Sequence, residues 1–192
     1  DLGFFGSITV MQQSREEMFA EIQRIADQMK LKFTFTRQPD TNGNWKKEML
    51  HTKYNLCPRG YGRNSFRFAE SIQMGRVPVF LWDDVPWIPY ENTNISVDHF
   101  GYSAALRASK EYLQYATVPM RETNFVNLMT KISHENKKSY HSKIVHLEDA
   151  RYHYTYEGLV NQIERFLLDP FGEFGGQLRC TRHPREERCC DK

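Results

Sequence analysis

Residues 56–71, LCPRGYGRNSFRFAES, place glycine, arginine and glutamate between an apolar run and an amphipathic stretch. Gly60 and Gly62 allow the backbone to approach a ligand closely or to adopt a positive φ. A helix that begins after such a turn points its unpaired N–H groups and the positive end of its dipole at the turn, which suits a phosphate. An arginine adds a bidentate fork for the same anion. These residue types suit a site for a phosphorylated ligand, and an ordinary Gly-rich turn between a strand and a helix is the alternative.

The segment after Asn64 predicts a helix with an apolar face and a polar face. The apolar face holds Phe66, Phe68, Ala69 and Ile72. The polar face holds Arg63, Arg67, Glu70 and Met74. Because the apolar face can pack on a sheet, Arg67 and Glu70 are expected to point away from it as neighbours three residues apart. A solvated ion pair between them is the alternative to a ligand site, and Gly75 is the expected C-cap.

Asp83 and Asp84 follow the next apolar run, Val77 to Trp82, which is typical of a strand covered on both faces. They are therefore expected at the same carboxyl edge of the sheet, where ligands bind in open α/β folds. The segment lacks the G-K-[ST] ending of a Walker loop, and G-Y-G-R-N-S does not fit G-x-G-x-x-G. The segment therefore contains neither of these two nucleotide-binding motifs.

The elements that must position these residues alternate between strand and helix. The pattern predicts strands near residues 2–8, 32–36, 53–56 and 77–82, with a further short strand at 95–97. It predicts helices from Ser14, with Glu17 completing a capping box, at 45–50, after Asn64, and at 121–132, 137–151 and 156–168. The predicted fold class is therefore α/β, a Rossmann-like parallel sheet flanked by helices. We assign residues 1–174 to this domain and 175–192 to a polar, poorly ordered tail.

The composition limits the classes of partner. The chain has 192 residues, enough for one domain with a sizeable core, and its formal charge of +2 does not suggest a nucleic-acid partner. No run reaches the ~18 apolar residues needed to span a bilayer, and no signal peptide is visible. Because the chain begins at Asp1 and a strand begins at Leu2, we expect preceding sequence, which could carry a membrane anchor.

The cysteines and histidines offer only weak metal candidates. Cys57 lies in an apolar run and is expected to be a small buried hydrophobe. The tail residues Cys180, His183, Cys189 and Cys190 fit no standard zinc spacing, so free thiols are the preferred interpretation. Dense ligand spacing is also lacking among His134, His141, His146 and His153. We therefore expect no metal.

One run of motifs extends over nearly thirty residues. It reads Cys57-Pro58-Arg59-Gly60-Tyr61-Gly62, then Ser65-x-Arg67-x-x-Glu70, then Met74-Gly75-Arg76-Val77-Pro78-Val79, then Asp83. This order and spacing resembles the signature of the exostosin family of glycosyltransferases. Weaker similarity extends from residue 1 to about residue 170.

The resemblance implies a GT-B architecture, in which two Rossmann-like halves enclose the active site and this chain is the C-terminal, nucleotide-sugar-binding half. It implies an inverting transfer of a sugar from a nucleotide-sugar donor to a glycan or glycoprotein acceptor, at a Golgi or other secretory-pathway membrane on the lumenal side. The donor is the substrate, and no metal or other cofactor is implied. Arg67 would contact the diphosphate, Glu70 would contact ribose or sugar hydroxyls, and Ser65 would lie by the phosphates.

The resemblance also assigns the residues around this pair. Arg59, Gly60, Tyr61 and Gly62 would line the approach to the donor, and Asp83 would touch the donor or cap the following loop. The catalytic base would lie in the missing N-terminal half, because two such halves need ~300 residues or more. A non-catalytic nucleotide- or glycan-binding module of the same fold is the alternative.

Three further features bear on this resemblance. Arg76 stands where the family commonly has a small or apolar residue, and residues 102–120 look like a lineage-specific insertion. Both features leave the donor sugar open. Asn94-Ile95-Ser96 is an N-glycosylation sequon, which mildly favours a secretory-pathway location.

Overall fold

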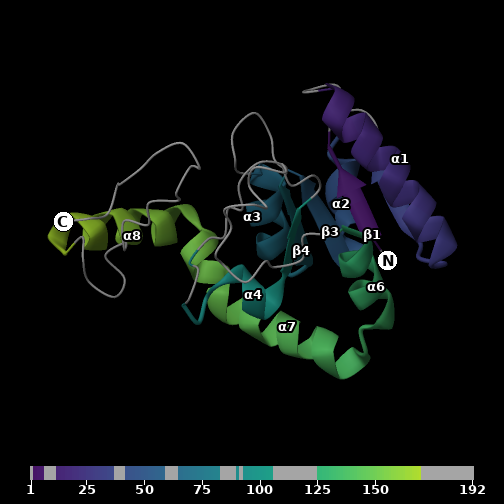
Figure 1. The fold of residues 1–192 in the computed structure, drawn as a ribbon. Coiled ribbons are helices and arrows are strands. Elements are labelled where there is room, and N and C mark those ends of the chain that lie inside the picture. Colours follow the sequence, from purple (N-terminus) through teal and green to yellow (C-terminus); the bar gives the residue numbers. More distant parts are fainter. Residues whose placement is uncertain are drawn as a thin grey trace, which may run out of the picture.

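The computed structural model describes residues 2–6, 12–36, 42–58, 65–82, 90, 93–105 and 125–169. Within this part, five strands form one parallel sheet (Figure 1): β1 (Leu2–Phe5), β2 (Phe33–Thr36), β3 (Tyr54–Pro58), β4 (Val77–Trp82) and β5 (Tyr102–Ala105). Their order across the sheet is β2-β1-β3-β4-β5. The predicted α/β fold with a parallel sheet is confirmed.

Helices cover both faces of this sheet. The helices that alternate with the strands are α1 (Gln12–Gln28), α2 (Asn44–Leu50), α3 (Phe66–Gln73) and α4 (Val97–Phe100). The C-terminal part adds α6 (Phe125–His134), α7 (Lys137–Ala150), the 3-10 helix η1 (Arg151–Tyr154) and α8 (Tyr156–Leu168). The helices predicted at 45–50, 137–151 and 156–168 and after Asn64 are confirmed within two residues at each end.

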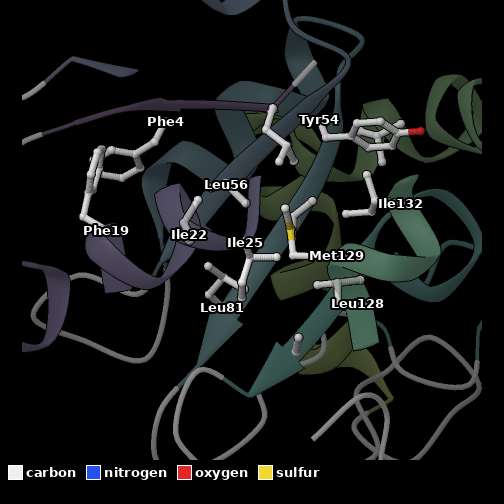
Figure 2. Packing of buried hydrophobic residues seen from close by; sticks show 14 residues of the cluster. Phe4, Phe19, Ile22, Ile25, Tyr54, Leu56, Leu81, Leu128, Met129 and Ile132 are labelled. Atoms are coloured by element: carbon white, nitrogen blue, oxygen red, sulfur yellow. The ribbon is translucent and has the colours of Figure 1, made fainter. Parts of the chain in front are cut away.

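One hydrophobic cluster fills the space between the sheet and the helices α1 and α6 (Figure 2). Ile22 of α1 and Leu128 of α6 are fully buried beside Leu56 of β3 and Leu81 of β4. Phe19 of α1 is also buried and joins an aromatic group on the first two strands. Burial of these side chains drives the packing of both helices on this face.

The other face of the sheet carries a second cluster, with α3, α4 and α7. Cys57 and Phe80 alternate along their strands with Leu56 and Leu81 of the first cluster, so β3 and β4 are buried on both faces. Phe68 of α3 stacks edge-on against Phe80 with ring centroids 5.9 Å apart. Continuous apolar strands such as β4 are typical of a sheet covered on both sides.

The strand order reverses between β1 and β3. From β1 the chain crosses to β2 on one side, and then returns to place β3, β4 and β5 on the other side. β1 and β3 pair only at Leu2↔Tyr54 and Gly3↔Asn55, although β1 continues to Phe5 and β3 continues to Pro58. The carboxyl halves of these two strands are therefore unpaired with each other. Open α/β sheets of this order bind ligands at such a reversal, outside the carboxyl ends of the strands.

Two local predictions are wrong. The first helix begins at Gln12, so Ser14 lies within it and is not its N-cap. Residues 95–97 form no strand, because Ser96 caps α4 by accepting the Asp98 N–H. A strand lies a few residues later, as β5, so the segment from Tyr102 to Ala105 belongs to the sheet.

The end of α3 agrees with the prediction for Gly75. Gly75 has a φ of 66°, in the left-handed region that favours glycine. Its N–H donates to the Ile72 carbonyl at 3.0 Å, and the Arg76 N–H donates to the Ser71 carbonyl at 2.9 Å. These two bonds form a Schellman motif, which turns the chain sharply into β4.

The last helix, α8, follows η1 and extends away from the sheet (Figure 1). Its large apolar side chains are exposed: Tyr156, Leu159, Val160, Ile163, Phe166, Leu167 and Leu168. Among the described helices, none combines the length and the apolar character that crossing a membrane requires. The predicted domain limit at residue 174 and the tail at 175–192 lie outside the described residues.

Candidate functional site

The candidate site begins where α3 starts, on the carboxyl side of β3. Ser65 lies at the N-cap position in an extended conformation, with φ −132° and ψ 120°, and it is buried. Its carbonyl accepts the Phe68 N–H at 3.0 Å, while its side chain makes no capping hydrogen bond. The structure thus places Ser65 at the helix start, as predicted, close to the reversal of the strand order.

Arg67 and Glu70 lie side by side on α3, as their spacing predicts. Arg67 Nη1 is 2.7 Å from Glu70 Oε2, and the two side chains are 21% and 38% exposed. Oε2 is buried and has no hydrogen-bond partner, so the contact is an ion pair without good hydrogen-bond geometry. Both side chains are therefore partly withdrawn from water and partly exposed.

The guanidinium of Arg67 also packs against α2. Its Cζ lies 4.1 Å from the centroid of the Trp45 ring, and Nη1 lies 4.0 Å from Met49 Sδ. The sequence predicted that Arg67 points away from the sheet packing but gave no neighbour for it on α2, where the side chain lies over Trp45. Trp45 was not predicted as a site residue, because its contact depends on how two separate helices pack.

This packing determines which donors of Arg67 can serve a ligand. A guanidinium has five N–H donors in one plane. In the described part of the chain, one face is covered by Trp45, and the polar contacts to Glu70 and Met49 both use Nη1. Burial lowers the pKa of Arg67, and the Glu70 carboxylate opposes that change. The group stays charged, and its Nε–Nη2 edge suits a bidentate contact with a phosphate.

The remaining predicted site residues have different outcomes. Five of them lie outside the described residues: Arg59, Gly60, Tyr61, Gly62 and Asp83. Asn94 is exposed in the turn before α4. The prediction that Phe66 lies on the face of the helix that packs on the sheet is wrong, because this side chain is 90% exposed. Phe66 is the first residue of α3.

Cys57 contributes packing and not chemistry. It is fully buried under α3, and its Sγ lies 3.6 Å from Ser71 Oγ. Burial raises the pKa of the Cys57 thiol to about 12, so the thiolate needed for nucleophilic attack does not form near neutral pH. The interpretation of Cys57 as a buried hydrophobe is confirmed.

A second polar cluster lies at the opposite, amino edge of the sheet. The Glu135 carboxylate, with its side chain 3% exposed, accepts hydrogen bonds from the hydroxyls of Tyr54, Tyr102 and Ser139, and it lies 3.1 Å from Lys143 Nζ. Every one of these partners belongs to this chain, so the cluster fastens the turn between α6 and α7 to the first residues of β3 and β5. It is a structural feature. In the part of the chain that the structure describes, no group of acidic, histidine or cysteine side chains could hold a metal ion.

Comparison of the chain with protein-family models, with curated proteins and with solved structures finds no match. The function must therefore be argued from the residues and their geometry.

Proposed function

We propose that this chain is the nucleotide-sugar-binding half of an inverting glycosyltransferase of the exostosin type. It would bind a nucleotide-sugar donor, whose sugar passes to a glycan or glycoprotein acceptor. The second Rossmann-like half of a GT-B enzyme, with the catalytic base, would come from sequence outside this chain. The motifs at residues 57–83 suggest the family, and the site geometry supports a diphosphate ligand.

The observation that carries the proposal is the position of the Arg67–Glu70 pair. The pair lies in the first two turns of α3, which starts at the carboxyl edge of β3. That edge adjoins the unpaired ends of β1 and β3, where sheets of this order bind their ligands. A helix N-terminus and an arginine converge there, and both stabilise phosphate oxygens.

In the proposed reaction, an acceptor hydroxyl attacks the anomeric carbon of the donor sugar as the bond to the diphosphate breaks. The base in the other half takes the hydroxyl proton, and the departing diphosphate takes the electron pair of the broken bond. Arg67 and the first-turn amides of α3 would stabilise that growing charge in the transition state. Attack from the face opposite the leaving group inverts the anomeric centre.

Glu70 would serve the neutral part of the donor. A carboxylate accepts hydrogen bonds from vicinal hydroxyls, as in a ribose or a hexose. Its Oε2 faces Arg67 at 2.7 Å, which leaves Oε1 for such a diol. The ion pair would thus fix the distance between the group that binds the diphosphate and the group that binds the sugar.

The sequon at Asn94 supports the proposed lumenal location. Its asparagine is exposed, so a glycan on this side chain would project into solvent. Ser96, the third residue of the sequon, is buried as the cap of α4. Because only the asparagine carries the sugar, the burial of Ser96 does not obstruct a glycan on Asn94.

Calorimetric titration of the chain with UDP, GDP, CDP and ADP tests the proposal. We expect one of them to bind, and Arg67→Ala to weaken that binding by about 2 kcal/mol, roughly 30-fold, since a charge-assisted contact is lost. Arg151→Ala is the matched control, because Arg151 pairs with Glu148 at the same i, i+3 spacing and 2.6 Å, away from the site. In the complete enzyme, Arg67→Ala and Glu70→Ala should each abolish transfer without unfolding the protein.

Failure of all four nucleotides to bind the folded chain would contradict the proposal. Binding with no transfer by the complete protein would instead favour the non-catalytic module. Wild-type turnover in Arg67→Ala or Glu70→Ala would overturn the roles assigned to them.

A further inference from the structure

Trp45 of α2 lies next to the guanidinium of Arg67 on α3. It lies in the first turn of α2, and it is partly exposed on a short helix. Its ring carries the guanidinium of Arg67 at 4.1 Å, which is a cation–π distance. Lys46 Nζ lies 5.5 Å from the same ring centroid. The indole is therefore a platform for cations, and one of these cations, Arg67, is the group that we propose binds the diphosphate.

An arginine without such a platform binds an anion with lower affinity, because its side chain loses conformational entropy on binding. Its long side chain must give up rotamer freedom to fix the planar fork in one orientation. Stacking on an indole removes much of that freedom before the ligand arrives. It also covers one face of the guanidinium while leaving the edge donors available, since the ring contact is to the face.

Arg67 is held on three sides in this way. Trp45 fixes the plane of the guanidinium, Glu70 fixes the direction of Nη1, and Met49 Sδ lies 4.0 Å from the same nitrogen. The contacts come from α2 and α3, which flank the reversal of the strand order on one face of the sheet. They leave the Nε–Nη2 edge for a ligand.

We propose that Trp45 is a positioning residue of the diphosphate site, which orients Arg67 for a bidentate contact by stacking on its guanidinium. This inference rests on the proposed function and adds to it a residue on a second element, α2. The substrate group that Trp45 serves is the diphosphate, reached through Arg67, and not the nucleobase.

The test is a double-mutant cycle on the 192-residue chain. The affinity is measured for inorganic pyrophosphate and for whichever of UDP, GDP, CDP and ADP binds most tightly. The proteins compared are the wild type, Trp45→Leu, Arg67→Ala and the double variant. Trp45→Leu should weaken the binding of both probes about tenfold in the wild-type background. It should have no further effect once Arg67 is alanine, because its contribution passes through that side chain.

Trp45→Phe is the conservative control, since it keeps an aromatic face under the guanidinium. It should restore affinity to within about threefold of the wild type. The upfield ring-current shift of the Arg67 δ protons, measured without ligand, should be present in the wild type and in Trp45→Phe and absent in Trp45→Leu. A purely structural tryptophan would change the unfolding transition without giving this pattern.

The outcomes separate the inference from the function beneath it. No binding of UDP, GDP, CDP or ADP by the wild type would overturn the proposed function. Normal binding by the wild type together with unchanged affinity in Trp45→Leu would overturn the role of Trp45 alone. An equal loss in the wild-type and Arg67→Ala backgrounds would show that Trp45 contacts the nucleotide directly, which also contradicts the inference.

Discussion

At the scale of single residues, the carboxylates of Glu70 and Glu135 each pair with a cation, but in very different surroundings. Glu70 is 38% exposed and shares a single contact with Arg67, whereas Glu135 is 3% exposed and has four side-chain partners. A carboxylate whose bonds are all supplied by its own chain has little capacity for a ligand. The difference assigns Glu135 to stability and leaves Glu70 for binding.

Glu135 makes stability depend on pH. Burial alone would raise its pKa, but the hydrogen bonds from Tyr54, Ser139 and Lys143 outweigh that effect and hold the pKa below its ordinary value of 4.5. The charged form is thus favoured by folding, and its contribution is complete above pH 4.5 and is lost as the pH falls through the lower, folded pKa. Burial and the same carboxylate raise the pKa of the Tyr54 hydroxyl.

We expect Glu135→Gln to lower the free energy of unfolding by about 2 kcal/mol at pH 7, and by less below pH 4.5, where the wild type loses the same contribution. Urea denaturation of both proteins at pH 7 and at acidic pH measures this difference. Glu148→Gln is the control, because its carboxylate is 50% exposed in the pair with Arg151 and should cost under about 0.5 kcal/mol. Equal losses in the two variants at pH 7 would contradict the account of the cluster.

Single-residue features of the site were predictable only where they are local. The pairing of Arg67 with Glu70 follows from helical spacing, and the structure has it. The stacking of Arg67 on Trp45 could not be predicted, because it depends on how two separate helices pack, and local sequence patterns do not show this. The exposure of Phe66 was also missed, because helical spacing alone does not show which residues of an apolar face are covered by other elements.

At the scale of elements, α3 positions the site, and its two ends are fixed differently. Its start is set by the extended conformation of Ser65, and its end by the Schellman motif at Gly75. A Cβ on Gly75 would lie 3.0 Å from Arg151 Nη2. The end of α3 therefore depends on glycine both for its φ of 66° and for space next to η1.

Gly75→Ala should lower the free energy of unfolding by about 1–2 kcal/mol, because alanine is strained at positive φ and the Arg151 side chain must shift. Thermal or urea denaturation measures the loss. Gly43→Ala is the matched control: Gly43 has a φ of 73°, and a Cβ there would have no atom within 4 Å. Gly43→Ala therefore carries the strain alone, and a larger loss at Gly43 than at Gly75 would sink this explanation.

The errors among the elements have a common physical cause. Ile95 and Val97 alternate like a strand and both are buried, yet Ser96 between them caps α4, so no strand forms there. β5 was missed because its residues become a strand only by pairing with β4, at Val79↔Tyr102 and the three pairs that follow. Elements with long, regular patterns, such as α7 and β4, were predicted because their signal is local.

At the scale of the whole molecule, alternating strands and helices predicted a parallel sheet but not the order of its strands. Right-handed crossovers permit β3 to lie beside β1 or beyond β2, and no short-range pattern separates these cases. The order β2-β1-β3-β4-β5 creates the reversal that the candidate site adjoins. The motif run and the strand reversal thus point to the same edge of the sheet by independent arguments.

The central claim, that a nucleoside diphosphate binds at this reversal, is tested most directly by titrating the ¹⁵N-labelled chain with UDP, GDP, CDP and ADP. We predict that one of them shifts the amide signals of Gly6, Ser65 and Arg67, at the carboxyl edge, and leaves those of Tyr54 and Tyr102, at the amino edge, unchanged. No shift with any of the four nucleotides at millimolar concentration, or shifts confined to the amino edge, would contradict it.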